Sequence, residues 1–317
     1  MYNEIQKKSK TEVSDHHLIE GFDNYLKIYK TVVDSTIKNN HIYIKRFFNW
    51  FNEHKFKSLQ EVNFEEINLF LSQYHSKYSL SSTRKLHYSL RSFFDYCRLE
   101  NIIKYDFKPI LPQRRIYSKS FVPAVLSKSE ISLLIDSAQA DKSNKGKRNY
   151  AMLLLLICYG IRGCQVRNLE LHDINWEDNT IFFKAVKNGN SVEQKIIPEV
   201  GNALVDYIIH IRPNSDCQKV FLSILDSHKG LTHSSRFSSI IGKLLDQAGI
   251  KVPSNALRGS QLFRHTFASQ LLLEGEPIKN ISDMLGHKYL TTTAIYTKID
   301  NNELRKVCLE WRESNEK

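Results

Sequence analysis

The first hundred residues of the chain contain almost nothing that would interrupt a helix. They hold one glycine, Gly21, and the first proline is Pro109. Because glycine and proline are the residues that most often end regular structure, their absence predicts a run of helices. Apolar residues recur there at helical spacing, as in Leu18, Phe22, Leu26 and Tyr29, and again in Ile44, Phe47, Phe48 and Phe51. We therefore predict a bundle of four or five helices over residues 12–106.

Two further helices of this bundle have recognisable starts. Asn63 followed by Glu66 is a capping signal, and another helix is expected to begin near Ser81 and Ser82. The polar side of that last helix is basic and carries Arg84, Lys85, Arg91 and Arg98. Such cations either bind a polyanion or only keep the helix soluble, and the pattern alone leaves both open.

The composition changes over residues 107–125, which contain three prolines and four cations and show no hydrophobic periodicity. This stretch is expected to be an extended linker that includes Arg114 and Arg115. Residues 126–317 then form a second domain. Its predicted helices are 127–138, 147–159, 164–173, 199–212, 234–248, 261–274, 278–285, 291–298 and 301–312. Two β-prone stretches, 180–186 and 192–197, flank an Asn-Gly step and predict a small antiparallel hairpin.

The charge balance narrows the class of protein. The chain has 317 residues with a net charge of +11, and its first 124 residues hold 20 of the 45 lysines and arginines but 13 of the 34 acidic residues. This excess favours a nucleic-acid partner. No apolar run approaches the ~20 residues of a membrane helix, and no secretory signal is visible. Five cysteines without a C-x-x-C pair fit a reduced, cytoplasmic setting.

Several kinds of chemistry are missing from the sequence. It contains neither a phosphate-binding G-x-x-x-x-G-K-[ST] loop nor a G-x-G-x-x-G motif, and its histidines and cysteines lack zinc-ligand spacing. We also find no acidic cluster suited to a two-metal nuclease. We therefore expect no nucleotide, metal or other cofactor. Chemistry at a phosphodiester would then need a protein nucleophile, cations around the phosphate and an acid for the leaving oxygen.

The second domain offers candidates for these three tasks at turns and helix ends. Gln261 lies three residues before Arg264, one of the candidates, on the same helical face, and is a possible transition-state contact. Each candidate alone has an ordinary structural explanation as a surface cation, a helix cap or a half-buried tyrosine. The candidates are Arg162, Lys187, Arg264, His287 and Tyr296.

Their order and spacing are more specific than any single residue. The strings YGIRGCQVRNLEL, KAVKNGNS, SQLFRHTFASQLL and MLGHKYLTTTAIYTKID follow one another along the chain. With them the sequence resembles the tyrosine recombinase (phage integrase) family over its whole length, and the ending looks most like integrases and transposases of mobile elements. The resemblance implies a mainly α protein: a helical, SAM-like core-binding bundle, then a mostly α catalytic domain with a small antiparallel sheet, the DNA breaking-rejoining fold.

The resemblance also assigns roles. Arg162 and Arg264 would be the two catalytic arginines, His287 the histidine of the Leu-Gly-His motif, and Tyr296 the nucleophile. The hairpin lysine would be Lys187, with Lys184 a weaker candidate. The implied reaction passes through a 3′-phosphotyrosyl intermediate without metal or ATP. Contacts with double-stranded DNA would come from the bundle and linker, through Arg84, Lys85, Arg91, Arg114 and Arg115.

Two positions depart from the family pattern. Gln261 stands where the family usually has histidine, three residues before Arg264. A glutamine can donate a hydrogen bond to a phosphate but cannot carry a proton at neutral pH. Gln165 stands three residues after Arg162, where the family mostly has an acid that supports the arginine. A neutral amide is expected to hold the guanidinium less firmly.

The family resemblance leaves the biological role open. Integration, excision or transposition of a mobile element is the leading interpretation, and resolution of chromosome or plasmid dimers would use the same residues. A type IB topoisomerase shares the chemistry, and a DNA-binding protein that no longer cleaves is the alternative outside enzymes. The predicted helix 301–312, with an apolar face at Leu304, Val307, Cys308 and Trp311, either packs on its own domain or docks on a neighbouring protomer. The resemblance implies docking, in a homo-tetramer acting at the bacterial nucleoid.

Overall fold

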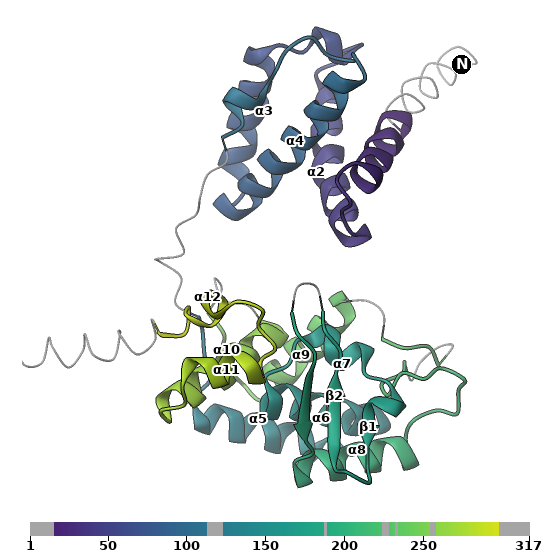
Figure 1. The fold of residues 1–317 in the computed structure, drawn as a ribbon, viewed down its shortest axis with the longest axis vertical. Coiled ribbons are helices and arrows are strands. Elements are labelled where there is room, and N and C mark those ends of the chain that lie inside the picture. The colour runs from purple at the N-terminus through teal and green to yellow at the C-terminus, as the bar shows by residue number, and fades with distance from the viewer. Residues whose placement is uncertain are drawn as a thin grey trace, which may run out of the picture. The chain divides into compact units, whose positions relative to one another are not determined.

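The structure is a computed structural model that describes residues 16–112, 123–186, 189–223, 228–231, 234–253 and 258–297; the side chains of 234–236 are not described. The chain divides into two compact units, Met1–Ser118 and Lys119–Lys317 (Figure 1). Each unit has a hydrophobic core of its own. The predicted helix 301–312 lies outside the described residues.

The N-terminal unit is the predicted helical bundle. In its described part a helical segment over residues 16–28 is followed by α2 (Asp34–Glu53), α3 (Phe64–Lys77) and α4 (Leu80–Leu99), with short 3-10 turns at Leu59–Glu61 and Lys108–Ile110. The Asn63–Glu66 capping box is confirmed. Helix α4 begins slightly earlier than expected, because the side chain of Ser79 caps it by accepting the Ser82 N–H. Fully buried aromatic rings fill the core, including Phe22, Phe47 and Phe93.

The C-terminal unit is mostly helical, as predicted. In order, its described helices are α5 (Lys128–Ala140), α6 (Asn144–Tyr159), α7 (Gly163–Asn168), α8 (Pro198–His210), α9 (Ser234–Gln247), α10 (Ser260–Leu273), α11 (Ile278–Met284) and α12 (Leu290–Thr293). The sheet is antiparallel, with strand order β1 (Ile174–Asn175), β2 (Thr180–Phe183) and β3 (Val192–Lys195). The expected fold class, mainly α with a small antiparallel sheet, is confirmed.

Most boundaries differ from expectation by a few residues, and two elements differ more. The helix predicted over 164–173 ends at Asn168, and a 3-10 turn (Leu171–Asp173) then leads into β1. Strand β1 was not predicted, because its two residues are too few to show an alternating pattern of apolar and polar positions. Helix α12 is also short, with four residues in place of the predicted 291–298.

Helix α6 forms the centre of the C-terminal unit and sets up the site. It packs against α5, α8 and α10, and residues 151–156 are all buried. It ends at Gly160, whose left-handed φ of 57° a residue with a side chain would adopt at a cost. A Cβ at this position would also lie 2.5 Å from the Phe267 ring on α10. The glycine therefore permits a tight turn, after which Arg162 immediately caps α7.

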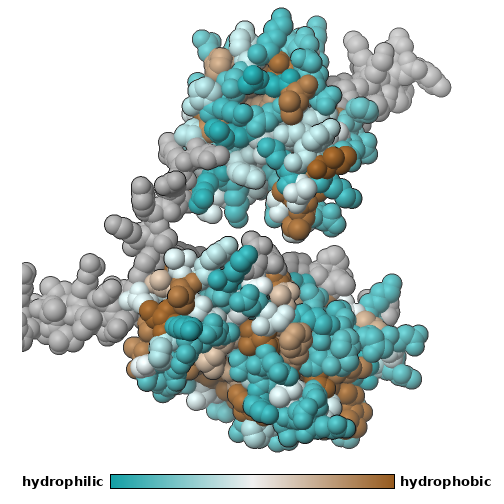
Figure 2. All heavy atoms as spheres, viewed as in Figure 1, coloured by the Kyte–Doolittle hydropathy of each residue, from teal (hydrophilic) through white to brown (hydrophobic). Residues whose placement is uncertain are grey.

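The surface of both units is largely polar. Figure 2 shows hydrophilic side chains over most of the visible face of each unit, interrupted by small apolar patches. In the part of the chain that the structure describes, no helix has the length and apolar character needed to cross a membrane.

Candidate active site

Four of the predicted catalytic residues lie in or next to four neighbouring helices of the C-terminal unit. Arg162 caps α7, Arg264 lies in α10, His287 follows α11, and Tyr296 follows α12. Arg264 links these places directly. Its Nη1 donates to Gly160 O at the end of α6 (3.0 Å), and its Nη2 donates to Leu285 O at the end of α11 (2.7 Å). The second arginine therefore holds together the two turns that present the first arginine and the histidine.

The two arginines leave a positive charge unbalanced inside the protein. Arg264 is only 2% exposed, and its pKa is lowered to about 10 by burial and then by the charge of Arg162. The Nη1 atom of Arg162 is buried without a hydrogen-bond acceptor among the described residues. No carboxylate pairs with either guanidinium in the described part of the chain. Buried charges are normally paired, so this arrangement is typical of a site for an anion.

His287 is held as a neutral imidazole. Its Nδ1 lies 2.8 Å from Thr293 Oγ1 of α12, and its backbone N–H donates to Ser282 O. Burial, then the charges of Arg264 and Arg162, lower its pKa to about 3. At neutral pH the ring therefore carries no charge, and the contact with Thr293 holds it in place.

Tyr296 is a buried residue in this structure. It is 2% exposed and packs with Ala268, Ile281 and Leu285. Burial raises the pKa of its hydroxyl, while the nearby charges of Arg264 and Arg162 and a hydrogen bond with Arg264 act to lower it. The hydroxyl also lies 3.1 Å from Nδ1 of His265. The predicted nucleophile is thus placed directly beside the second arginine.

The hairpin lysine cannot be placed, because Lys187 and Asn188 lie outside the described residues. The adjacent backbone nevertheless meets the site. The N–H of Asn190 donates to Gly286 O (3.1 Å), and a Cβ on Gly189 would lie 2.8 Å from the same oxygen and 3.2 Å from Arg162 Nη1. The end of the hairpin loop therefore touches both the turn before His287 and the first arginine.

Lys184, the weaker lysine candidate, is engaged elsewhere. Its Nζ pairs with Glu170 and with Asp173 (3.1 Å), and Lys219 also pairs with Glu170 (2.8 Å). Glu170, His172 and Asp173 lie close enough together to be considered as metal ligands. The two ammonium groups already supply positive charge to this cluster, and hydrogen bonds from Lys184 and then Lys219 lower the pKa of Glu170 to about 2. The cluster is accounted for as an ion-pair network.

Gln261 and Gln165, the two glutamines that depart from the family pattern, differ in burial and in the contacts the structure gives them. Gln261 is half-buried in the first turn of α10, one turn before Arg264. Gln165 is 5% exposed; its Oε1 accepts the Arg162 N–H (3.0 Å), and its Nε2 donates to Lys184 O (3.1 Å). The amide therefore holds the backbone of Arg162 and joins α7 to the end of β2, contacts that need both an acceptor and a donor.

Sequence reasoning missed two residues of the site, His265 and Thr293. His265 stands inside the string SQLFRHTFASQLL, directly after Arg264 and four residues after Gln261. The four-residue spacing was the available signal, since it places His265 one turn beyond Gln261 on the same side of the helix. Its contact with Tyr296 joins residues 31 positions apart and carries no local signal.

The predicted DNA-binding cations are placed unevenly. Arg84 and Lys85 are exposed on α4. Arg91 is half-buried, and its Nη1 donates to Lys108 O (3.1 Å) and Leu111 O (2.9 Å), so it holds the segment that follows the bundle. Arg114 and Arg115 lie outside the described residues.

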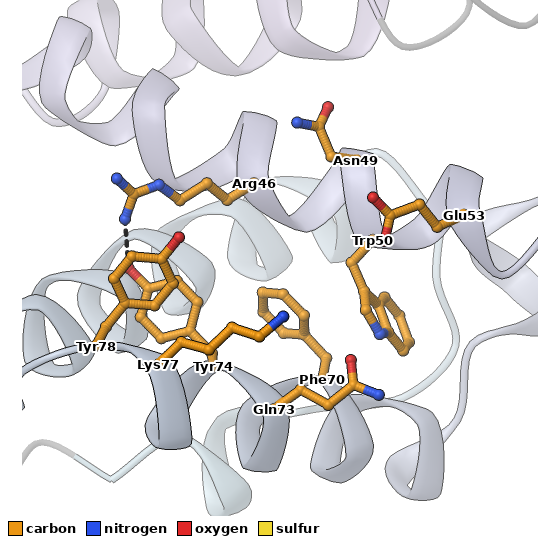
Figure 3. A pocket seen from close by; sticks show the side chains of 9 residues that line it. All are labelled: Arg46, Asn49, Trp50, Glu53, Phe70, Gln73, Tyr74, Lys77 and Tyr78. Atoms are coloured by element: carbon orange, nitrogen blue, oxygen red, sulfur yellow. Dashed lines mark hydrogen bonds between the residues drawn. The ribbon is translucent and has the colours of Figure 1, made fainter.

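One cation of the N-terminal unit that sequence reasoning did not select is held by aromatic rings. Arg46 of α2 lies 4.7 Å from the centre of the Tyr78 ring and donates to the Tyr74 hydroxyl (2.7 Å), as Figure 3 shows. These contacts border a groove of about 200 Å³ between α2 and α3. The groove also contains Trp50, whose buried Nε1 has no acceptor among the described residues. Arg46 therefore ties α2 to the end of α3 and fixes one cation at the surface.

Comparisons with known proteins agree with this architecture. Residues 124–303 match the model of the phage integrase family, and residues 19–101 match its N-terminal SAM-like domain. The chain therefore belongs to the phage integrase family, whose members are tyrosine recombinases. It is 29% identical over 309 residues to a Sinorhizobium fredii protein named integrase/recombinase y4rA, covering 97% of this chain and 74% of that one. It is also 27% identical over 304 residues to the tyrosine recombinase XerC of Oceanobacillus iheyensis, covering 92% and 94%.

Solved structures show the same fold. The post-cleavage complex of the XerH site-specific recombinase with its difH substrate matches with a TM-score of 0.69 and 20% identity, covering 87% of this chain and 80% of that one. A lambda integrase dimer bound to a COC′ core site matches with a TM-score of 0.67 and 16% identity, covering 89% and 94%. The expected family and fold class are thereby confirmed.

Proposed function

We propose that the chain is a site-specific DNA recombinase that cuts and rejoins DNA through a 3′-phosphotyrosyl intermediate. The observation that carries the proposal is the pair of guanidinium groups, Arg162 and Arg264, which share a largely buried site beside Tyr296 with no carboxylate partner among the described residues. A phosphodiester would supply the missing negative charge. The family to which the chain belongs consists of recombinases, which supports the same conclusion.

In this proposal the arginines bind the scissile phosphate through their planar, multiply donating heads. They oppose the charge that develops on the non-bridging oxygens as Tyr296 attacks phosphorus. His287 donates one further hydrogen bond from its neutral ring, with Thr293 fixing its orientation. Lys187 protonates the departing 5′-oxygen, which would otherwise leave as a strongly basic alkoxide. Because the phosphotyrosyl bond conserves the energy of the broken one, neither ATP nor a metal ion is required.

The proposal also divides DNA binding and catalysis between the two domains. We assign DNA binding to residues 12–106 and to the basic linker 107–125, and catalysis to residues 126–317. Arg84, Lys85, Arg114 and Arg115 contact phosphates, which gives affinity without specificity for sequence. The acting form is a homo-tetramer on two DNA duplexes, in the cytoplasm. The dimer and tetramer complexes of lambda integrase with DNA support an oligomer of this kind.

We infer that the role is integration, excision or transposition of a mobile element, in keeping with the relative named integrase/recombinase. Resolution of chromosome or plasmid dimers is the second candidate, because a relative named XerC aligns over 92% of the chain. The two roles differ in the DNA that is recombined. They are separated by supplying the element's own termini or a chromosomal site as the substrate.

The chemistry is tested with nicked suicide substrates built from the DNA that flanks the gene. The protein is incubated with them in EDTA, and covalent adducts are separated on denaturing gels. We expect an adduct with the wild-type protein and with Tyr289→Phe, a control at an exposed tyrosine of the same segment. We expect none with Tyr296→Phe. Tight binding without any adduct would show instead a DNA-binding protein that does not cleave.

A further inference from the structure

A histidine without an assigned role contacts the predicted nucleophile. His265 Nδ1 lies 3.1 Å from the Tyr296 hydroxyl, and the two rings are 5.5 Å apart between centres. His265 lies in α10 directly after Arg264, on the well-packed helix that supports the site. The charge of Arg264 also acts on the same hydroxyl, so the tyrosine oxygen lies beside both a cation and an imidazole.

We propose that His265 accepts the proton of the Tyr296 hydroxyl as that oxygen attacks the scissile phosphate. This inference rests on the proposed function and deepens it by naming the base. In the neutral tautomer that carries its proton on Nε2, His265 offers Nδ1 as the acceptor for the hydroxyl hydrogen of Tyr296. The imidazole thereby supplies a proton acceptor that Gln261, one turn earlier on the same helix, cannot provide, because an amide does not titrate near neutral pH.

The electrostatic surroundings keep this base available. Burial and then the charge of Arg264 lower the pKa of His265 to about 4, so its ring is neutral at physiological pH. The charged and titratable groups that act on it or contact it include Arg264, His287 and Tyr296. A phosphate bound between the arginines would offset their charge. The basicity of His265 therefore rises at the stage when the proton has to move.

The O–H bond of Tyr296 breaks, and an N–H bond forms at His265 Nδ1. The tyrosine oxygen bonds to phosphorus while the bond from phosphorus to the 5′-oxygen breaks, and that oxygen takes a proton from Lys187. In rejoining, a 5′-hydroxyl gives its proton back to the neutral Lys187 amine as its oxygen bonds to phosphorus. The bond from phosphorus to the tyrosine oxygen breaks, and the imidazolium returns its proton to that oxygen.

The test uses His265→Asn, whose side-chain oxygen can accept a hydrogen bond near the position of Nδ1 but cannot take up a proton. Gln270→Ala, on the same helix, is the control. Cleavage is measured on a nicked DNA substrate and on one in which sulfur replaces the bridging 5′-oxygen. A thiolate leaves without protonation, so the sulfur substrate makes cleavage independent of Lys187 and reports on the tyrosine alone.

We expect His265→Asn to bind DNA normally and to cleave both substrates on the order of 100-fold more slowly. Its rate should rise about tenfold per pH unit between pH 6 and 9, because only spontaneously ionised tyrosine reacts. The wild-type and Gln270→Ala rates should be nearly flat over this range. If the asparagine protein melts at a lower temperature than wild type, His265→Gln is measured in the same way.

Two results would overturn the inference while leaving the proposed function intact. One is cleavage by the variants at the wild-type rate, and the other is slow cleavage with an unchanged, flat pH profile, which would mean a packing role. Absence of any adduct from the wild-type protein would instead contradict the proposed function itself.

Discussion

At the scale of single residues, the site depends on pairs of hydrogen bonds that a different side chain could not make together. Gln165 accepts the Arg162 N–H and donates to Lys184 O from a buried position. A carboxylate could make the first contact but has no hydrogen for the second. The amide at this position is therefore a structural link of its own between α7 and β2, and its loss is expected to affect the fold and the site together.

Replacing Gln165 with methionine tests this link. Methionine has a similar volume, so it removes both hydrogen bonds without leaving a large cavity, and the Arg162 N–H and the Lys184 C=O lose their partner. We expect the free energy of unfolding in urea to fall by about 1–3 kcal/mol and adduct formation to slow. The exposed Gln139→Met is the matched control and should change little. Equal stability of the two variants would contradict the assignment.

The sequence predicts the site residues that belong to ordered motifs, but not those whose role depends on contacts between distant segments. Arg162, Arg264, His287 and Tyr296 were predicted from motif order, and the structure brings them to neighbouring positions. The contacts of His265 with Tyr296 and of Thr293 with His287 depend on how α12 packs on α10 and α11. Lys184 is a weaker candidate from the family resemblance, and the sequence alone does not show that its ammonium group pairs with Glu170 and Asp173. Interactions of this kind leave no local pattern.

At the scale of elements, the close approach of the β2–β3 hairpin to the turn before His287 brings Gly189, two residues after the predicted lysine, close to Arg162. This approach is a backbone contact, in which Asn190 N–H donates to Gly286 O and Gly189 passes close to the same oxygen. The hairpin itself was predictable from the Asn-Gly step. Its docking partner was not, because Gly286 is almost a hundred residues further along the chain.

Gly189→Ala should move the hairpin away from the site. The added Cβ would lie 2.8 Å from Gly286 O and 3.2 Å from Arg162 Nη1, and the first of these is backbone that cannot easily yield. We expect adduct formation to fall on the order of tenfold or more, as a small misplacement of catalytic groups can cause, while DNA binding is kept.

The control is Gly242→Ala in α9, where a Cβ meets nothing within 4 Å. Alanine is the better helix former, so this variant should be as stable as the wild type or more stable, by up to about 1 kcal/mol. Wild-type cleavage by Gly189→Ala would show that the hairpin is not held against the site.

At the scale of the whole molecule, two buried neutral histidines link stability to pH. The pKa values of His265 and His287 are lowered from 6.5 to about 4 and about 3, chiefly by burial. Between these values and 6.5 the unfolded chain binds more protons than the folded one. Stability is therefore present above pH 6.5 and is lost as the pH falls toward 4 for His265 and toward 3 for His287.

Lowering the pH from 7 to 5 should reduce the free energy of unfolding by on the order of 2 kcal/mol for each of these two histidines. Urea unfolding at the two pH values measures this loss for the full chain. His265→Asn should lose less stability than the wild type on acidification, by about the share of one histidine. An identical loss in both proteins would show that His265 is not buried as a neutral ring.

The proposed reaction requires Tyr296 to form a covalent bond with the 3′-phosphate of a cut DNA strand. The most direct measurement is mass spectrometry of the adduct from a nicked suicide substrate after nuclease and protease digestion. We predict a nucleotide attached to the peptide that contains Tyr296, and a free 5′-hydroxyl on the released strand. Attachment at another residue, or a released strand that carries a 5′-phosphate, would contradict this account.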